Sequence, residues 1–143
     1  MSMQDLISDF ISRVNNAVLA EHSNVLVIKN KLVINISKWM VKRKFFFEFE
    51  ESGDYHLLIK INAEEIGKLI RVSKTGKRVF ANNKKFPVIV NAKGFNLIST
   101  SQGVKSDLEC RKEKIGGEVL LQILKTTKSS VKFYTKKEAL KVS

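Results

Sequence analysis

The sequence predicts an α+β fold made of two small lobes. Apolar residues recur with helical spacing near the N terminus, and two β-rich runs flank a turn at residues 51–54. Further β-rich runs, separated by short turns, continue from residue 69 to residue 124. Because residues 62–67 are the only segment suited to a linker, we expect the lobes to cover residues 1–63 and 64–124.

The first lobe is expected to contain one clear helix and a β-hairpin. Four apolar side chains mark one face of a helix over about residues 4–20: Leu6, Phe10, Val14 and Val18. Residues 24–28 form a short β-rich run. Residues 45–50 alternate aromatic and acidic side chains, and the turn at 51–54 leads to a return strand over 55–61.

Residues 31–43 fit two different structures. The alternation of Leu32, Ile34 and Ile36 indicates a strand. A helix would instead bring three lysines of the segment to one polar stripe: Lys31, Lys38 and Lys42. Periodicity alone leans slightly toward a strand for the first half of the segment.

The second lobe is expected to be mainly antiparallel β with short helices. Its strands are expected over residues 69–73, 78–81, 95–98 and 119–124. The first two would form a hairpin around a turn that contains Gly76. A short helix is expected over residues 84–91, and another over 107–114 with Ser106 as its N-cap.

A row of three hydroxyl side chains distinguishes the stretch between the last two strands. Ser99, Thr100 and Ser101 precede Gln102 and Gly103. We interpret this segment as a loop held between two strands, which offers small donors and acceptors to phosphate, ribose or base edges. No G-x-x-x-x-G-K-[ST] pattern occurs in the chain, so a loop that hydrolyses nucleotide phosphates is not expected.

The charge of the chain indicates a polyanionic partner. The net charge is +12, and nucleic acid is the commonest partner of such a protein. Basic residues are concentrated in 29–44 and 66–114, whereas residues 45–65 are acidic and are expected to face away from RNA. No apolar run has the length of a membrane span, so no membrane partner is expected.

Catalysis is not expected from this chain. A serine nucleophile needs a base, and the only histidines, His22 and His56, lie in the first lobe. Cys110 is the only cysteine and is expected to be a small buried residue, which excludes an internal disulfide and a multi-cysteine zinc site. No catalytic residue, metal site or cofactor is predicted, and a serine-dependent hydrolase is a remote alternative.

Several separated motifs resemble the small-subunit ribosomal protein eight family of bacterial and organellar type. The hydroxyl row with Gly103, the Ser106-Asp107 helix start and the glycine pair before Glu118 occur in the family's order. The resemblance covers about residues 3 to 124. The sequence departs from the family at several positions: Gln102 replaces a usual Lys, Phe80 a usual Tyr and Asn15 a common Arg.

The resemblance implies an early binder of ribosomal RNA that docks the central domain of the small-subunit RNA. It also implies a helix for residues 31–43, proteins five and two of the small subunit as neighbours, and a monomer within the ribosome. A translational repressor that grips messenger RNA is the alternative. The expected RNA contacts are Lys31, Lys38, Lys42, Lys74, Lys77, Arg78, Phe80, Ser99, Thr100, Ser101, Gln102 and Gly103. Glu118, with Gly116 and Gly117, is expected to support the hydroxyl segment by accepting hydrogen bonds from it.

Composition and the C-terminal end add two expectations. Lysine greatly outnumbers arginine, and Ile, Asn and Phe are abundant, which hints at an AT-rich genome. We therefore expect an organelle, a plastid rather than a mitochondrion, with the bacterial cytoplasm as the alternative. Residues 125–143 form a basic extension beyond the resemblance, expected to dock on ribosomal RNA or a neighbouring protein through Phe133 or Tyr134.

Overall fold

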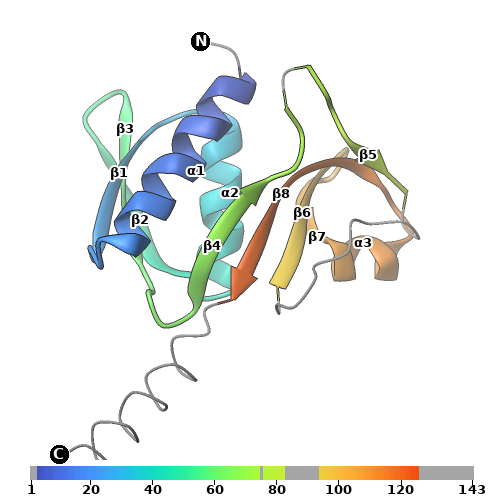
Figure 1. The fold of residues 1–143 in the computed structure, drawn as a ribbon. Coiled ribbons are helices and arrows are strands. Elements are labelled where there is room, and N and C mark those ends of the chain that lie inside the picture. Colours follow the sequence, from blue (N-terminus) through green and yellow to red (C-terminus); the bar gives the residue numbers. More distant parts are fainter. Residues whose placement is uncertain (1–2, 75, 83–93, 126–143) are drawn as a thin grey trace, which may run out of the picture.

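The computed structural model describes residues 3–74, 76–82 and 94–125 (Figure 1). The first lobe follows the predicted helix-strand-helix-strand-strand order. Its elements are α1 (Met3–Leu19), β1 (Asn24–Ile28), α2 (Lys31–Lys42), β2 (Phe46–Ser52) and β3 (His56–Ile61). The second lobe is mainly antiparallel β, as predicted. Its elements are β4 (Ile66–Arg71), β5 (Phe80–Ala81), β6 (Gly94–Thr100), β7 (Gly103–Ser106), α3 (Asp107–Glu113) and β8 (Gly117–Lys125).

Two sequence expectations lie outside the described residues. These are the short helix over residues 84–91 and the docking of the extension beyond residue 125. Among the helices of the described ranges, none is both long enough and apolar enough to cross a membrane.

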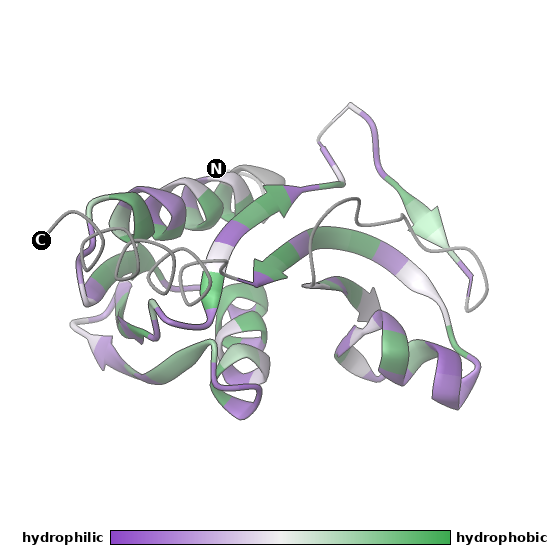
Figure 2. Ribbon diagram, turned by 60° about the horizontal axis from the view of Figure 1, so that its bottom comes forward, coloured by the Kyte–Doolittle hydropathy of each residue, from purple (hydrophilic) through white to green (hydrophobic). Residues whose placement is uncertain are grey.

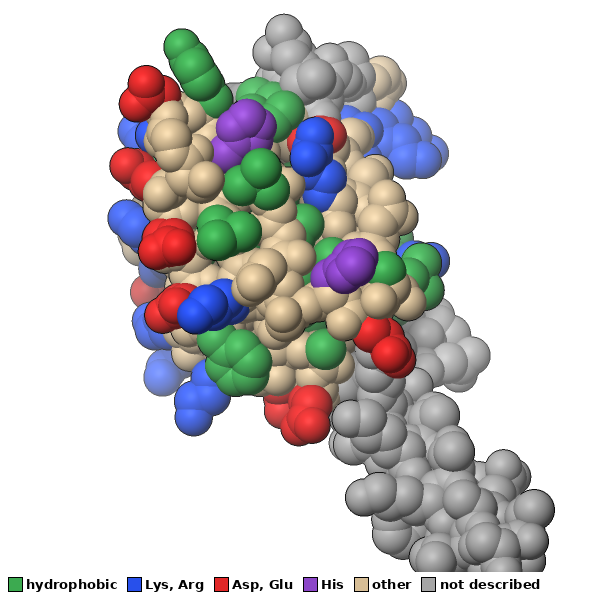
Figure 3. All heavy atoms as spheres, turned by 90° about the vertical axis from the view of Figure 1, so that its left-hand side faces the viewer, with side chains coloured by type: hydrophobic (Ala, Val, Ile, Leu, Met, Phe, Trp, Pro, Cys, Tyr) green, Lys and Arg blue, Asp and Glu red, His purple; other side chains and the backbone are tan. Residues whose placement is uncertain are grey.

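The first lobe is a three-stranded sheet in the order β1-β3-β2, covered on one face by helices. Val27, Leu57 and Ile59 alternate toward the helices and are buried, because successive side chains of a strand point to opposite faces. The acidic residues of β2 lie toward the solvent, where Glu48 pairs with Lys60 at 2.9 Å. Figure 3 views this side of the molecule, where acidic and basic side chains border a mixed apolar and polar surface.

Residues 31–42 form a helix, which the family resemblance favoured over the strand periodicity. Asn30 caps it, since its side-chain oxygen accepts a hydrogen bond from the Val33 backbone N–H at 2.7 Å. The buried positions follow helical spacing: Val33, Ile36 and Met40. The alternation that indicated a strand is therefore incidental, and the predicted lysine stripe of Lys31, Lys38 and Lys42 is exposed.

The second sheet has the strand order β4-β8-β6-β7, and β5 also pairs with β8. The turn of the expected hairpin is confirmed, because Lys74 and Lys77 pair with each other in an antiparallel bridge. Beyond the turn, however, β5 does not return along β4. Phe80 lies opposite Glu118 of β8, and the Val119 N–H donates to the Val79 carbonyl at 2.8 Å. β4 and β5 therefore follow one another along the same edge of β8, opposite β6, and do not pair with each other.

Two further boundaries differ from expectation. β4 begins at Ile66, inside the segment expected to be a linker, which leaves residues 62–65 as the connection. The hydroxyl segment is not a free loop, because Ser99 and Thr100 end β6 and Gly103 begins an unpredicted strand, β7. The division into lobes near residue 63 remains a prediction.

The hydrophobic core continues from one sheet to the other. Phe10 and Val14 of α1 belong to the same buried cluster as Leu69 of β4 and Leu121 of β8. Figure 2 shows the hydrophobic stretch of β8 lying between the first lobe and α3. A smaller cluster under α3 contains Cys110, which is buried as predicted, and burial raises the pKa of its thiol.

Candidate nucleic-acid interface

The hydroxyl segment forms a tight β6–β7 turn. The Thr100 hydroxyl donates to the Gly103 carbonyl at 2.7 Å and accepts from the Gln102 N–H at 3.1 Å. Gly103 has a φ of +112°, a conformation that other residues rarely adopt. Thr100 therefore builds the turn and retains only acceptor capacity, whereas Ser101 and Gln102 are exposed at its tip.

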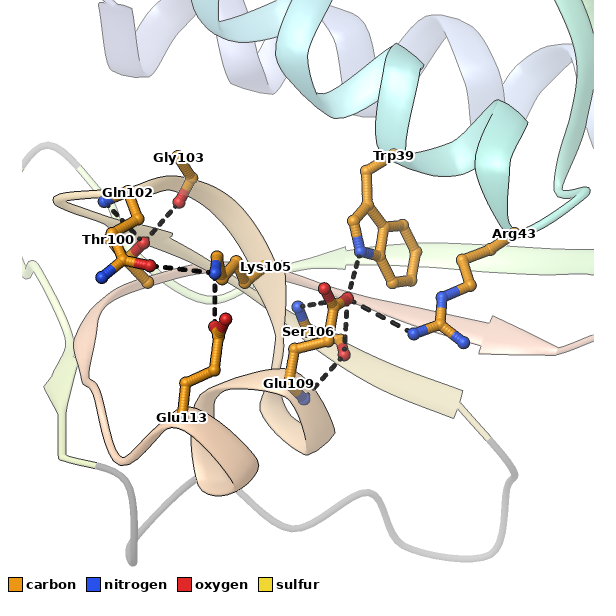
Figure 4. A network of polar contacts seen from close by, with 9 residues as sticks. All are labelled: Trp39, Arg43, Thr100, Gln102, Gly103, Lys105, Ser106, Glu109 and Glu113. Carbon is orange, nitrogen blue, oxygen red and sulfur yellow. Dashed lines mark hydrogen bonds and ion pairs between the residues drawn. The ribbon is translucent and has the colours of Figure 1, made fainter.

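Lys105 connects this turn to α3 (Figure 4). Its ammonium group donates to the Gln102 side-chain oxygen at 3.1 Å and pairs with the Glu113 carboxylate. The side chain of Lys105 is only 17% exposed. Lys105 was not among the predicted site residues, because its position in a four-residue strand carries no distinctive sequence signal.

Glu109 forms a second polar centre at the start of α3. The Ser106 and Glu109 side chains cap the helix reciprocally, as in a capping box. Glu109 also accepts a hydrogen bond from the Trp39 ring N–H at 2.8 Å and pairs with Arg43 at 3.4 Å (Figure 4). Burial alone would raise the pKa of Glu109, but hydrogen bonds from Trp39, Ser106 and Arg43 outweigh it and lower the pKa.

Arg78, Phe80 and Glu118 form a third group on β5 and β8. Two hydrogen bonds, of 3.0 and 2.6 Å, join the Arg78 guanidinium to both oxygens of the buried Glu118 carboxylate. Those bonds and the charge of Glu118 raise the pKa of Arg78. The guanidinium lies 5.5 Å from the centre of the Phe80 ring, which is 66% exposed. An exposed aromatic ring is thus held beside a fixed cation.

Glu118 connects this group to the hydroxyl segment through the backbone. It lies opposite Ser99 in the β6–β8 ladder, while its described side-chain hydrogen bonds come from Arg78. The expected support of the hydroxyl segment by Glu118 therefore remains a prediction. Glu118 is only 7% exposed, so it is not an ordinary solvent-exposed glutamate of a strand.

The glycine pair allows β8 to approach its neighbours on both sides. A Cβ atom on Gly117 would lie 2.1 Å from the Ser99 carbonyl oxygen, and one on Gly116 would lie 2.4 Å from that of Ala81. A shallow hollow of about 430 Å³ lies beside the pair. Its lining residues are Phe80, Ala81, Asn82, Lys114, Gly116 and Gly117.

The predicted basic residues fall into two places. Lys74 and Lys77 are exposed at the turn that leads to Arg78 and β5. The lysine stripe lies on α2, which contacts β7. The structure thus brings Arg78, Phe80 and the hydroxyl segment together in one sheet, while the α2 stripe remains a separate surface. His56 belongs to the other sheet, opposite Ile28 of β1.

Comparisons with known proteins identify the family of this chain. The family model of ribosomal protein S8 matches residues 5–124. The small ribosomal subunit protein uS8 of Thermosynechococcus vestitus is 36% identical over 132 residues, covering 86% of this chain and 99% of that protein. The uS8c proteins of Gracilaria tenuistipitata var. liui and Pyropia yezoensis are each 38% identical, covering 85% and 86% of this chain and 98% and 99% of their own.

The matched region runs through both lobes and includes the hydroxyl segment, the glycine pair and Glu118. The relatives are covered almost from end to end. This chain therefore belongs to the ribosomal protein S8 family, a family of structural constituents of the small ribosomal subunit and not of enzymes.

Proposed function

We propose that the chain binds the central domain of small-subunit ribosomal RNA through its second lobe, early in subunit assembly. The observation that carries this proposal is the placement of Arg78 and Phe80 across β8 from the β6 end that bears Ser99. A base can stack on the exposed face of the Phe80 ring, since every base has a π face. The adjacent guanidinium would meet the phosphate or the base edge of the same nucleotide.

The β6–β7 turn would add sequence-dependent contacts. Ser101 and Gln102 are exposed at its tip and can meet sugar hydroxyls or base edges. Glu118 would act indirectly by holding Arg78, because a carboxylate placed against RNA would be repelled by phosphates. Exposed lysines would neutralise phosphates and make the affinity depend on salt: Lys31, Lys38, Lys42, Lys74 and Lys77.

The proposal extends to compartment and partners. The uS8c names of two relatives, and the abundance of amino acids whose codons are rich in A and T, favour a plastid ribosome, with a bacterial ribosome as the alternative. The family resemblance suggests small-subunit proteins five and two as neighbours, with one copy of this chain in each subunit. The basic extension beyond residue 125 would then meet ribosomal RNA or such a neighbour.

A pair of exposed phenylalanines allows a matched test. Phe80 is 66% exposed beside Arg78, and Phe47 is 64% exposed on the acidic first-lobe sheet. Binding would be measured to transcripts of the central and 5′ domains of small-subunit RNA from Thermosynechococcus vestitus. We expect tighter binding to the central domain, and a loss of about 1–3 kcal/mol for Phe80→Ala through lost stacking. Phe47→Ala should bind like the wild type.

Equal affinity for the two transcripts, or equal losses for the two phenylalanine variants, would contradict the proposal. Sedimentation of tagged protein with small subunits separates the ribosomal role from translational repression. A repressor would be recovered on free messenger RNA instead.

A further inference from the structure

One carboxylate oxygen joins the two lobes. The Glu109 Oε1 atom accepts the Trp39 ring N–H at 2.8 Å and an Arg43 N–H at 3.4 Å, both from α2. The same atom accepts the Ser106 hydroxyl at 3.2 Å and the Ser106 N–H at 3.4 Å. Figure 4 shows these partners converging on Glu109 from α2 and from the β7–α3 corner.

A helix cap alone does not require the α2 partners. Ser106 and Glu109 satisfy a capping box by themselves, and α3 has only seven residues to cap. Trp39 and Arg43 are therefore additional, and they lie far from Glu109 in sequence. Their bonds couple the first lobe to the strand that ends at Ser106.

The Trp39 side has little freedom to move. The Trp39 ring is buried, stacks on Phe45 at 6.2 Å and meets Phe95 edge-on at 5.8 Å. The Arg43 guanidinium lies 5.5 Å from the Trp39 ring centre. Since a packed ring fixes the direction of its N–H group, the hydrogen bond to Glu109 has a defined geometry.

Each end of this connection continues into a predicted RNA-contacting surface. The α2 helix that carries Trp39 also carries the exposed stripe of Lys31, Lys38 and Lys42. The β7 strand runs from the Ser106 cap back to Gly103 in the hydroxyl turn, only four residues in all. One short rigid path therefore links the basic stripe with the turn.

We propose that Glu109 is a positioning residue that fixes the α2 lysine stripe at a set spacing from the β6–β7 turn, so that both lobes bind one RNA at once. This inference rests on the proposed RNA binding and adds its geometry. Two attached sites gain affinity only when both can engage together, so the spacing contributes to recognition. A base-stacking site with independent lysines would not need the spacing.

The chain offers variants that separate this role from capping and packing. Trp39→Phe deletes the N–H donor and keeps an aromatic ring against Phe45. Glu109→Gln keeps an acceptor for Trp39 and a functional capping box, since glutamine also serves at that position. Glu109→Ala removes both. Lys38→Gln combined with Lys42→Gln removes charge from the stripe and leaves Trp39, Arg43 and Ser106, the partners of Glu109, unchanged.

The test is a double-mutant cycle on affinity for the central-domain transcript. In the wild-type background, the lysine pair should lower the slope of log affinity against log salt by a little under two units. We expect Trp39→Phe to bind about three- to tenfold more weakly, which is the range for the net contribution of one ordinary hydrogen bond. In the Trp39→Phe background the two lysine substitutions should weaken binding clearly less than they do in the wild type. The affinity of Glu109→Gln should stay near that of the wild type.

Additive effects of Trp39→Phe and the lysine pair would overturn the inference, as would wild-type affinity for both Trp39→Phe and Glu109→Ala. If Trp39→Phe fails to fold, the lysine pair is combined with Glu109→Ala instead, and Glu109→Gln serves as the control. Trp39 is the only tryptophan, so its emission should change in Glu109→Ala and not in the matched Ser101→Ala variant. Absence of transcript binding by the wild type would instead contradict the proposed function, whatever the fluorescence shows.

Discussion

Two glutamates of the second lobe each accept hydrogen bonds from an arginine, but the arginines come from different parts of the fold. Glu118 on β8 uses both oxygens to hold Arg78, which precedes the adjacent strand β5. Glu109 on α3 shares one oxygen among Trp39, Arg43 and Ser106. The first pair works within one sheet, whereas the second crosses between the lobes.

The difference shows how one residue type can serve two purposes in a small RNA-binding fold. At Glu118 the exposed partner, Arg78, lies at the proposed contact surface and the carboxylate stays buried. At Glu109 the buried partner, Trp39, lies in the core. The Glu109 carboxylate connects the helix that carries the lysine stripe with the strand that leads to the β6–β7 turn. Variants near Glu118 should therefore change local contacts, and variants near Glu109 should change how the lobes act together.

The largest effect is expected where β8 enters the Glu118 site. Gly117→Ala places a Cβ atom 2.1 Å from the Ser99 carbonyl oxygen, a backbone atom that cannot move without separating β6 from β8. We expect the free energy of unfolding to fall by about 2–4 kcal/mol, as in severe overpacking. Urea unfolding would measure it. Gly76→Ala is the control, because a Cβ there meets nothing within 4 Å; an equal loss in both variants would contradict the argument.

The next effect concerns the Glu118 carboxylate itself. Glu118→Ala should leave the fold intact and weaken binding to the central-domain transcript by about 1.5–3 kcal/mol, because Arg78 loses two charge-assisted hydrogen bonds that orient it. Glu118→Gln, which keeps one acceptor, should lose less. Simple removal of a negative charge would have the opposite sign. Tighter RNA binding by Glu118→Ala would show that the carboxylate does not orient Arg78.

These two sites also show what the sequence could predict. The helical faces of α1 and the Ser106 cap follow from local spacing, and both are confirmed. The Ser106-x-x-Glu109 pattern is itself visible in the sequence. Its Trp39 partner lies 70 residues away, so no local period could indicate it. The Arg78–Glu118 pair spans 40 residues and depends on β5 pairing with β8, which the hairpin interpretation missed.

The hydroxyl segment was misjudged for a related reason. Serine and threonine are common in turns, so a row of three indicates a loop. Threonine is also a good strand residue, and Thr100 is the last residue of β6. The strand β7 has only Val104 as an apolar side chain, which is too little for a periodic signal. The strand conformation of residues 103–106 depends on their hydrogen bonds to β6, which a periodic pattern within the segment cannot reveal.

Substitutions in the β6–β7 turn should have smaller effects, and they separate a loss of stability from a loss of RNA affinity. Thr100→Ala and Ser101→Ala should each weaken RNA binding by about 1–3 kcal/mol, the range for a lost base-edge contact. Only Thr100→Ala should also lower stability, by about 1 kcal/mol, since its hydroxyl closes the turn. Thr100→Ser keeps the hydroxyl and is the matched control. Wild-type affinity in the double alanine variant would remove this turn from the interface.

The smallest expected effect is the pH dependence of the Glu109 connection. Hydrogen bonds from Trp39, Ser106 and Arg43 outweigh burial and hold the pKa of Glu109 below its ordinary value of 4.5. The folded state therefore favours the ionised carboxylate, which stabilises the fold above pH 4.5 and loses this contribution as the pH falls through the lowered value. Glu109→Gln cannot titrate and retains the acceptor, so its stability should fall less between pH 7 and pH 3 than that of the wild type. Urea midpoints at both pH values would measure the difference. Parallel losses in the two proteins would mean that the charge of Glu109 does not contribute to the free energy of unfolding, and that the lobes are held together by the shared core.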